Sequence, residues 1–179
     1  MLLQALVVVV VLLVAFLGYV ATRPNTFRVQ RTLRINAPSE SIFPLVNNLH
    51  SWSEWSPWEK KDPAMRRTYR GPDSGPGAFY AWDGNKDIGA GSMEITDAVP
   101  TSRIALKLDF LRPFEAHNLV DFTLVPEGSA TIITWTIHGP CPYFAKLLHL
   151  FMDMDKMIGK DFEAGLANLK SLAEKQPVA

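Results

Sequence analysis

The feature that most constrains this chain is an uncharged apolar run at its N-terminus, from Leu2 to Val20, in which Gln4 is the only strongly polar residue. As an α-helix the run would be roughly 28 Å long, close to the thickness of the hydrocarbon core of a bilayer. Tyr19 suits the membrane interface at its end, and Arg23-Pro24 then terminates it. The run therefore predicts a transmembrane helix.

A cleaved signal peptide is the main alternative for this segment. Against it, no basic residue precedes the run, the run exceeds a usual signal-peptide core, and only a poor cleavage site follows at Tyr19-Val20-Ala21. A buried core helix is a third possibility, because unbroken apolarity does not suit a surface helix. We predict a membrane anchor over residues 1–22, with membrane contact through residues 2–20, and a linker over residues 23–26.

Positive charge lies on one side of the apolar run. Arg23, Arg28, Arg31 and Arg34 follow it, and no Lys or Arg precedes it. The positive-inside rule therefore favours a domain in the cytoplasm, although three of these arginines fall in a predicted strand and weigh less than free juxtamembrane charges. We expect a single-pass protein of a bacterial inner membrane with its domain on the cytoplasmic side.

The composition of the chain suits one packed domain. Apolar residues make up 47% and charged residues 20% of its 179 residues, which argues against disorder. Lys+Arg and Asp+Glu are equal at 18 each, so the basic excess expected of a nucleic-acid-binding protein is missing. Cys141 is the only cysteine, which excludes an internal disulfide.

The region after the linker begins as a strand and continues with short helices. Residues 27–36 alternate between apolar and polar, with Arg31 intruding on the apolar side. A short helix follows Ala37-Pro38, a second is predicted over residues 49–55, and Pro57 is expected to end this region. Antiparallel strands separated by turn residues are then predicted over residues 66–69, 78–83, 92–98, 103–111, 117–125 and 130–138.

The last pattern is that of one long helix from Tyr143 to about Lys175, with Gly159 and Gly165 inside it. Glycine there would let the sheet or a ligand come close. A sheet must bury one face, and this helix is the one predicted element long enough to cover it. We predict an α+β domain over residues 27–175, with a curved antiparallel sheet of about six or seven strands wrapped around the helix, and a tail over residues 176–179.

This order of elements resembles the helix-grip fold of the START/Bet v 1-like (SRPBCC) superfamily, and specifically its polyketide cyclase/dehydrase-like branch. The resemblance covers nearly everything from Phe27 to Lys170. It rests on Ile35-Asn-Ala-Pro-Ser-Glu40, Trp52-Ser-Glu-Trp-Ser-Pro-Trp58, Tyr80-Ala-Trp82, Gly89-Ala-Gly91, Thr134-Trp135, and Met157-Ile-Gly-Lys-Asp-Phe162 with Gly165-Leu166 and Leu169. The resemblance implies binding of lipids, sterols, polyketides or other hydrophobic ligands, and some members are enzymes.

Large apolar side chains are the candidates for a ligand pocket. The three tryptophans at positions 52, 55 and 58 could wall a pocket mouth, or staple the short helices to the domain. Strand alternation points further side chains at the long helix, where they would line a cavity or form the core. The pocket candidates are Trp52, Trp55, Trp58, Tyr80, Trp82, Leu106, Leu108, Phe110, Trp135, Phe151, Met154 and Ile158.

Signals for catalysis are weak. The four histidines form no metal pair at a usable spacing, so no metal site and no cofactor are predicted. A cyclase or dehydratase would need an acid or base facing the pocket, for which Glu54 and Asp83 are candidates. His117 is expected on the strand face opposite Asn118.

We expect a membrane-anchored domain that binds a hydrophobic small molecule or lipid and does not bind nucleic acid. The alternatives are a small cyclase or dehydratase acting on an aromatic or polyketide-like substrate, and an anchored protein-interaction domain.

Overall fold

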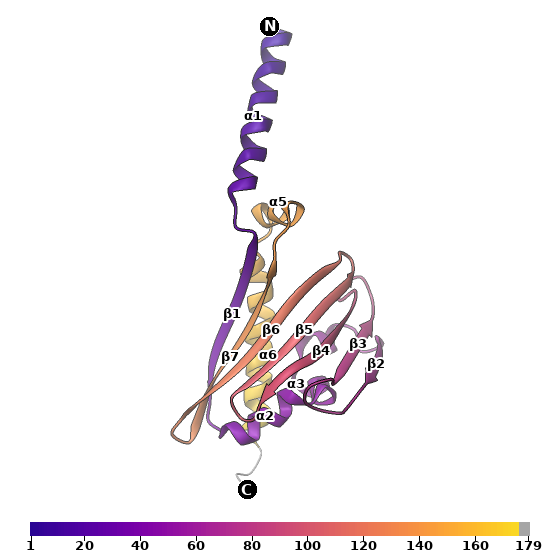
Figure 1. The fold of residues 1–179 in the computed structure, drawn as a ribbon, viewed down its shortest axis with the longest axis vertical. Coiled ribbons are helices and arrows are strands. Elements are labelled where there is room, and N and C mark those ends of the chain that lie inside the picture. Colours follow the sequence, from indigo (N-terminus) through magenta and orange to yellow (C-terminus); the bar gives the residue numbers. More distant parts are fainter. Residues whose placement is uncertain (176–179) are drawn as a thin grey trace.

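The computed structural model describes residues 1–175, so the predicted tail over residues 176–179 lies outside the described residues. The elements follow in chain order (Figure 1). They are α1 (Leu2–Thr22), β1 (Thr26–Ile35), α2 (Ser39–Asn47), the 3-10 turn η1 (Leu49–Ser51), α3 (Trp52–Trp55), α4 (Pro57–Lys61), β2 (Arg66–Arg70), β3 (Phe79–Asp83), β4 (Ala90–Val99), β5 (Arg103–Arg112), β6 (Ala116–Glu127), β7 (Ala130–Pro140), α5 (Tyr143–Phe151) and α6 (Met154–Ala173).

Seven strands form one antiparallel sheet in the order β1-β7-β6-β5-β4-β3-β2. Strands β2 to β7 are a meander, because each pairs with its neighbour in sequence, and β1 returns to pair with β7 from Thr26–Pro140 to Ile35–Thr131. The sheet curves around α6, which lies on its concave face (Figure 1). This architecture confirms the predicted α+β helix-grip fold.

The predicted single C-terminal helix is wrong in one respect, because the chain breaks it into α5 and α6. Met152 has an extended conformation, and Asp153 then caps α6 by accepting a hydrogen bond from the backbone N–H of Lys156 at 3.0 Å. Aspartate is a preferred N-cap residue, so the break is encoded locally. The apolar repeat continues across the break and hides it from a periodicity argument.

Pro57 begins a helix and does not end the helical region, which corrects a second expectation. It occupies the first turn of α4, where its missing N–H costs nothing and its fixed φ favours the helix. The helical region after β1 therefore consists of α2, η1, α3 and α4, and not of two short helices. The extra turn places Trp58 and Glu59 on the domain interior.

Both glycines of α6 lie where this helix comes close to its neighbours. A Cβ at Gly165 would lie 2.8 Å from the ring of Trp135, and one at Gly159 would overlap the guanidinium of Arg31. Arg31, the arginine on the apolar side of β1, forms ion pairs with Asp155 at 3.0 Å and Glu163 at 2.7 Å. The sheet, and not a ligand, occupies the space that these glycines leave.

The helix α1 extends away from the sheet and meets the domain through α5 (Figure 1). The hydroxyl of Tyr143 donates to the backbone carbonyl of Leu17 at 2.8 Å, and Val20 is buried in this junction. Among residues 1–175, α1 is the one helix long and apolar enough to cross a membrane.

Candidate ligand site on the concave face

The predicted pocket residues divide by burial into two groups. The closed group, at most 3% exposed, consists of Trp52, Trp55, Tyr80, Leu106 and Trp135. The open group is half-buried and consists of Trp58, Trp82, Leu108, Phe110, Met154 and Ile158. Phe151 belongs to neither, because it lies on α5 with 76% of its surface exposed.

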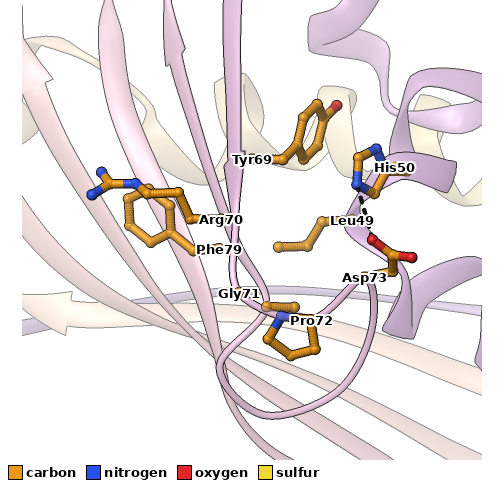
Figure 2. A pocket seen from close by; sticks show the side chains of 9 residues that line it. Leu49, His50, Tyr69, Arg70, Gly71, Pro72, Asp73 and Phe79 are labelled. Carbon is orange, nitrogen blue, oxygen red and sulfur yellow. Dashed lines mark ion pairs between the residues drawn. The ribbon is translucent and has the colours of Figure 1, made fainter.

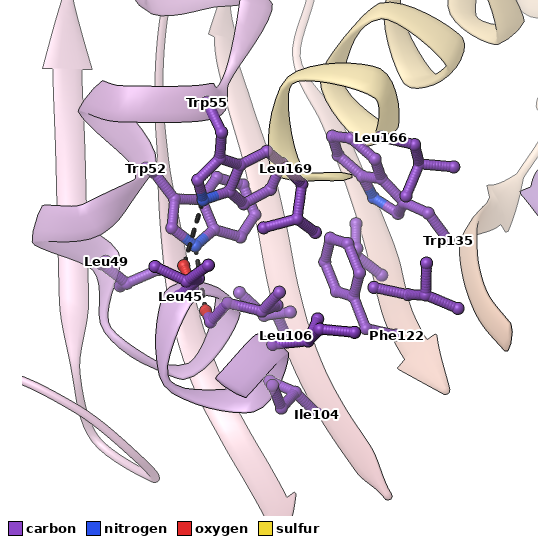
Figure 3. Packing of buried hydrophobic residues seen from close by; sticks show 14 of the residues in the cluster. Leu45, Leu49, Trp52, Trp55, Ile104, Leu106, Phe122, Trp135, Leu166 and Leu169 are labelled. Carbon is purple, nitrogen blue, oxygen red and sulfur yellow. Dashed lines mark hydrogen bonds between the residues drawn. The ribbon is translucent and has the colours of Figure 1, made fainter. Parts of the chain in front are cut away.

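Two tryptophans of the closed group hold the short helices together. The indole N–H of Trp52 donates to the carbonyl of Val46 at 2.9 Å, and that of Trp55 donates to the carbonyl of Leu45 at 3.0 Å (Figure 3). Both acceptors lie in α2, so each tryptophan satisfies a polar atom while its ring fills the core. This is the geometry of the stapling interpretation.

The closed group is packed against α6 and the middle of the sheet. Trp135 stacks on Phe162 of α6 with ring centroids 4.0 Å apart. It also stacks on Phe122 of β6, with ring centroids 4.9 Å apart (Figure 3). Trp52 and Trp55 meet at 4.7 Å in the same cluster. Ring contacts at these distances are those of a filled core. The indole N–H of Trp135 is buried within it and has no acceptor among residues 1–175.

Burial falls toward α5 on three separate elements of the concave face. On β5, Leu106 is buried and Leu108 half-buried, and on β3 the same change occurs from Tyr80 to Trp82. On α6, Phe162 is buried whereas Ile158, one turn closer to α5, is half-buried. The Arg112 end of β5 lies beside the Asp83 end of β3, and Phe114, just after β5, packs against Phe144 of α5. Five members of the open group, Trp82, Leu108, Phe110, Met154 and Ile158, lie on these elements and form a half-exposed apolar end of the concave face. Trp58 of α4 instead packs against Trp135 and Phe162.

A glycine shapes this open end. Gly91 of β4 lies between Trp82 and Phe110 in the register of the sheet, and a Cβ on it would lie 2.6 Å from the Trp82 ring. Without that Cβ, the two rings pack edge to face with centroids 5.8 Å apart. The Gly89-Ala-Gly91 segment noted in the sequence thus begins β4 and seats an aromatic side chain.

A buried carboxylate that sequence reasoning missed lies beside the closed group. Glu59 of α4 is 8% exposed, accepts a hydrogen bond from the Tyr80 hydroxyl at 2.7 Å, and pairs with Arg67 of β2 at 2.8 Å. Burial and the neighbouring carboxylate raise the pKa of Tyr80 well above its usual value. Every group is paired, so the network fastens α4 to the sheet. The one sequence signal for this buried carboxylate is the position of Glu59 directly after Trp58.

The acids and the histidine considered from the sequence are exposed or already paired. Glu54 is exposed on α3, and Asp83 pairs with Arg66 at 2.7 Å and with Arg112. His117 is exposed, and a hydrogen bond to Asp109 at 2.7 Å raises its pKa. Within residues 1–175 no cluster of three or more His, Cys, Asp or Glu side chains could hold a metal ion.

None of the twelve predicted residues lines either of two surface cavities formed by residues 1–175. One of about 140 Å³ lies between η1 and β2, where the His50 ring stacks on Tyr69 at 3.9 Å and faces Asp73 at 3.7 Å (Figure 2). The other, of about 190 Å³, lies at the junction of α1 with the domain and includes Cys141 and Lys146.

Solved structures share this fold at low sequence identity. A protein from Chromobacterium violaceum is 16% identical with a TM-score of 0.59, over 86% of this chain and 100% of its own. DynU16, from the dynemicin biosynthetic locus, is 15% identical with a TM-score of 0.60, over 86% of this chain and 48% of its own. A protein from Thermobifida fusca is 19% identical with a TM-score of 0.60, over 83% and 93%. No curated protein matches.

The sequence also matches the model of a protein family over residues 26–174, which is the whole sheet together with the helices that cover it. The matched region begins at β1 and ends just after α6, so it contains both groups of predicted pocket residues. The chain belongs to the family described as polyketide cyclase/dehydrase and lipid transport.

Proposed function

We propose that the domain binds a lipid-like apolar molecule at the open end of its concave face, and that α1 anchors it in a membrane. The observation that carries this proposal is the fall in burial toward α5 on β3, β5 and α6. The half-buried side chains are apolar, and the β5–β6 turn beyond Phe110 contacts α5, which in turn contacts α1. A ligand drawn from the bilayer would meet them first.

Covering these side chains would be favourable. Burial of apolar surface contributes about 25 cal/mol per Å², so a ligand that covers several of these half-exposed side chains gains appreciable affinity. Anchoring would add a high local concentration at the surface where such ligands partition. The family description, which includes lipid transport, supports the same function.

Catalysis draws less support from the same residues. A cyclase or dehydratase needs an acid or base that faces the bound molecule. The buried carboxylate of Glu59 is already bonded to Tyr80 and Arg67, and Asp83 pairs with two arginines. These pairings support binding over an enzymatic reaction.

The ligand proposal is tested by native mass spectrometry of the full chain purified from a bacterial host in mild detergent, followed by organic extraction of bound molecules. We expect a retained lipid-sized mass. Leu108→Gln, in the open group, should abolish it, whereas the matched control Leu119→Gln should not. Asn118 pairs with Leu108 across β5 and β6. Leu119, the next residue, therefore points to the opposite face of the sheet and is exposed. A protein that is empty, or equally loaded in both variants, would overturn the proposal.

The anchor proposal is tested separately by alkaline carbonate extraction of membranes from cells that make the full chain. A chain that spans the bilayer stays in the pellet, and we expect that result. We also expect the N-terminus of α1 to lie outside the cytoplasm. Protease added to intact spheroplasts should leave the domain uncut. Release by carbonate, or cleavage of the domain from outside, would contradict the anchor or its orientation.

A further inference from the structure

The cavity at the foot of α1 brings together four parts of the chain. Its walls come from the end of α1 (Arg23), the start of β1 (Thr26), the residue after β7 (Cys141) and α5 (Lys146, His149). Its volume is about 190 Å³. It lies where α1 leaves the domain, and thus at the level of the lipid headgroups if α1 spans a bilayer.

Positive charge in this cavity has no acidic partner. Lys146 is 6% exposed, and its ammonium meets the carbonyl of Ala21 at 3.4 Å as its one hydrogen bond among the described residues. Neither Lys146 nor Arg23 has a carboxylate within ion-pair distance in residues 1–175, unlike Arg31 with its two. A buried ammonium without a counter-ion is costly. The cavity therefore favours an anion.

The other groups around the cavity do not supply that anion. Burial lowers the pKa of His149 and raises the pKa of Cys141, so both are neutral near pH 7. The ring nitrogen Nδ1 of His149 lies 3.4 Å from the Cys141 sulfur, which fixes the ring toward β7. The charge of the cavity is thus that of Arg23 and Lys146.

Exposed apolar side chains surround this end of the domain. Phe144 and Phe151 of α5 are 58% and 76% exposed, and Phe114, before β6, is 62% exposed and packs against Phe144 at 6.1 Å. Aromatic side chains beside the polar end of a membrane helix are typical of a surface that lies in the headgroup region. Their continuity with α1 identifies the bilayer as the partner of this surface.

We propose that the cavity binds the phosphate of an anionic phospholipid headgroup, held by Arg23 and Lys146. This inference rests on the anchoring of α1 in a membrane. The guanidinium of Arg23 can bind phosphate through two hydrogen bonds, and the ammonium of Lys146 supplies a point charge from α5. The exposed rings of α5 and Phe114 then lie among the upper acyl chains, which brings the open group close to the bilayer.

The test uses the full chain in nanodiscs of mixed phosphatidylglycerol and phosphatidylcholine, with retained lipids counted by native mass spectrometry. The wild type should retain phosphatidylglycerol in preference. Arg23→Gln and Lys146→Met should each reduce that preference about tenfold, the loss of one charge-assisted hydrogen bond. Lys146→Arg should keep it. The matched control Arg28→Gln, on the outer face of β1 and bonded to Gln30, should leave it unchanged.

Three results would overturn the inference. One is an equal preference in all variants, and another is a loss in Arg28→Gln as large as in Arg23→Gln. The third is a thermal stabilisation by inorganic phosphate as large as that by phosphatidylglycerol, which would assign the cavity to the free ion. Arg23 is exposed, so its variant keeps the test valid even if Lys146→Met fails to fold. Carbonate extraction in parallel separates failure of the anchor from failure of the headgroup site.

Discussion

The two ends of the concave face contain the same kinds of side chain but differ in what lies opposite them. Away from α5, the rings of Trp52 and Trp55 from α3 pack over the sheet and meet Phe122. Toward α5, Trp82 and Phe110 have no such cover and stay half-buried. The difference shows that an inward-pointing aromatic residue becomes core only where a second layer of helix reaches it.

The ion pairs of the two halves also differ in how exposed they are. In the closed half, Glu59 pairs with Arg67, and their side chains are 7% and 27% exposed. In the half nearer α5, the partners of Arg31 on α6 are 63% and 61% exposed. Removal of one partner from a buried ion pair costs much stability, because the other charge stays buried. Removal of an exposed partner costs little, because water solvates the remaining charge. The comparison can therefore be tested by stability measurements in both halves.

The largest expected effect is the loss of a ring from the closed half. Trp55→Ala removes a fully buried indole and its hydrogen bond to Leu45, and should lower the free energy of unfolding by about 3–5 kcal/mol. Phe151→Ala, at the exposed end, should change it by less than about 0.5 kcal/mol. Urea unfolding of the full chain in detergent, followed by circular dichroism, measures both. Equal losses would refute the comparison.

The next effect compares the two ion pairs. Glu59→Gln leaves Arg67 without its counter-ion, and should lower the free energy of unfolding by about 2 kcal/mol. Glu163→Gln removes an exposed partner of Arg31, which keeps Asp155, and should cost at most about 0.5 kcal/mol. The same urea titration measures the difference. A larger loss for Glu163→Gln would show that the half nearer α5 is the more rigid one.

A smaller effect separates the two glycines of α6. Both gain about 1 kcal/mol of helix propensity on replacement by alanine, so their difference reports packing alone. Gly165→Ala pushes against the buried ring of Trp135 at a packing cost of about 1–3 kcal/mol, which leaves a net destabilisation of about 0–2 kcal/mol after the propensity gain. Gly159→Ala pushes against the guanidinium of Arg31, which can rotate away, and should stay within about 1 kcal/mol of the wild type. Thermal unfolding of the two variants side by side checks the order.

The smallest effect is expected at high pH. The pKa of Tyr80 is raised by burial and by Glu59, so above pH 10 the unfolded chain loses this proton before the folded chain does. Stability therefore falls as the pH rises above 10, because the unfolded state binds fewer protons. Tyr80→Phe should flatten this fall, as measured by urea midpoints at increasing pH. An unchanged slope would show that Tyr80 ionises freely in the folded chain.

The sheet and its faces followed from periodicity. Alternation correctly placed Trp135 toward α6 and His117 on the opposite face from Asn118, because side chains of a strand point to alternating sides. The break at Met152 was missed, since an apolar repeat of three and four residues passes through Asp153 without interruption. Only the cap geometry distinguishes two helices from one there.

The candidate site was predicted less completely than the fold. Six of the twelve pocket candidates are half-buried and five are core, because pattern reveals the face of a residue and not the element that covers it. Glu59 and Lys146 were not singled out, since a charged residue in a short helix usually faces water. Their burial depends on contacts with β2 and α1, far away in the sequence.

The sequence by itself determined the apolar helix α1, the antiparallel sheet and the covering helix, because length, hydropathy and alternation act over neighbouring residues. The tertiary structure alone decided which end of the concave face is filled. It also decided that Glu59 is paired and that Arg23 and Lys146 share a cavity without an acid. The reason is that burial and pairing depend on residues that the fold brings together from distant parts of the chain, and the local sequence pattern does not indicate which residues those are.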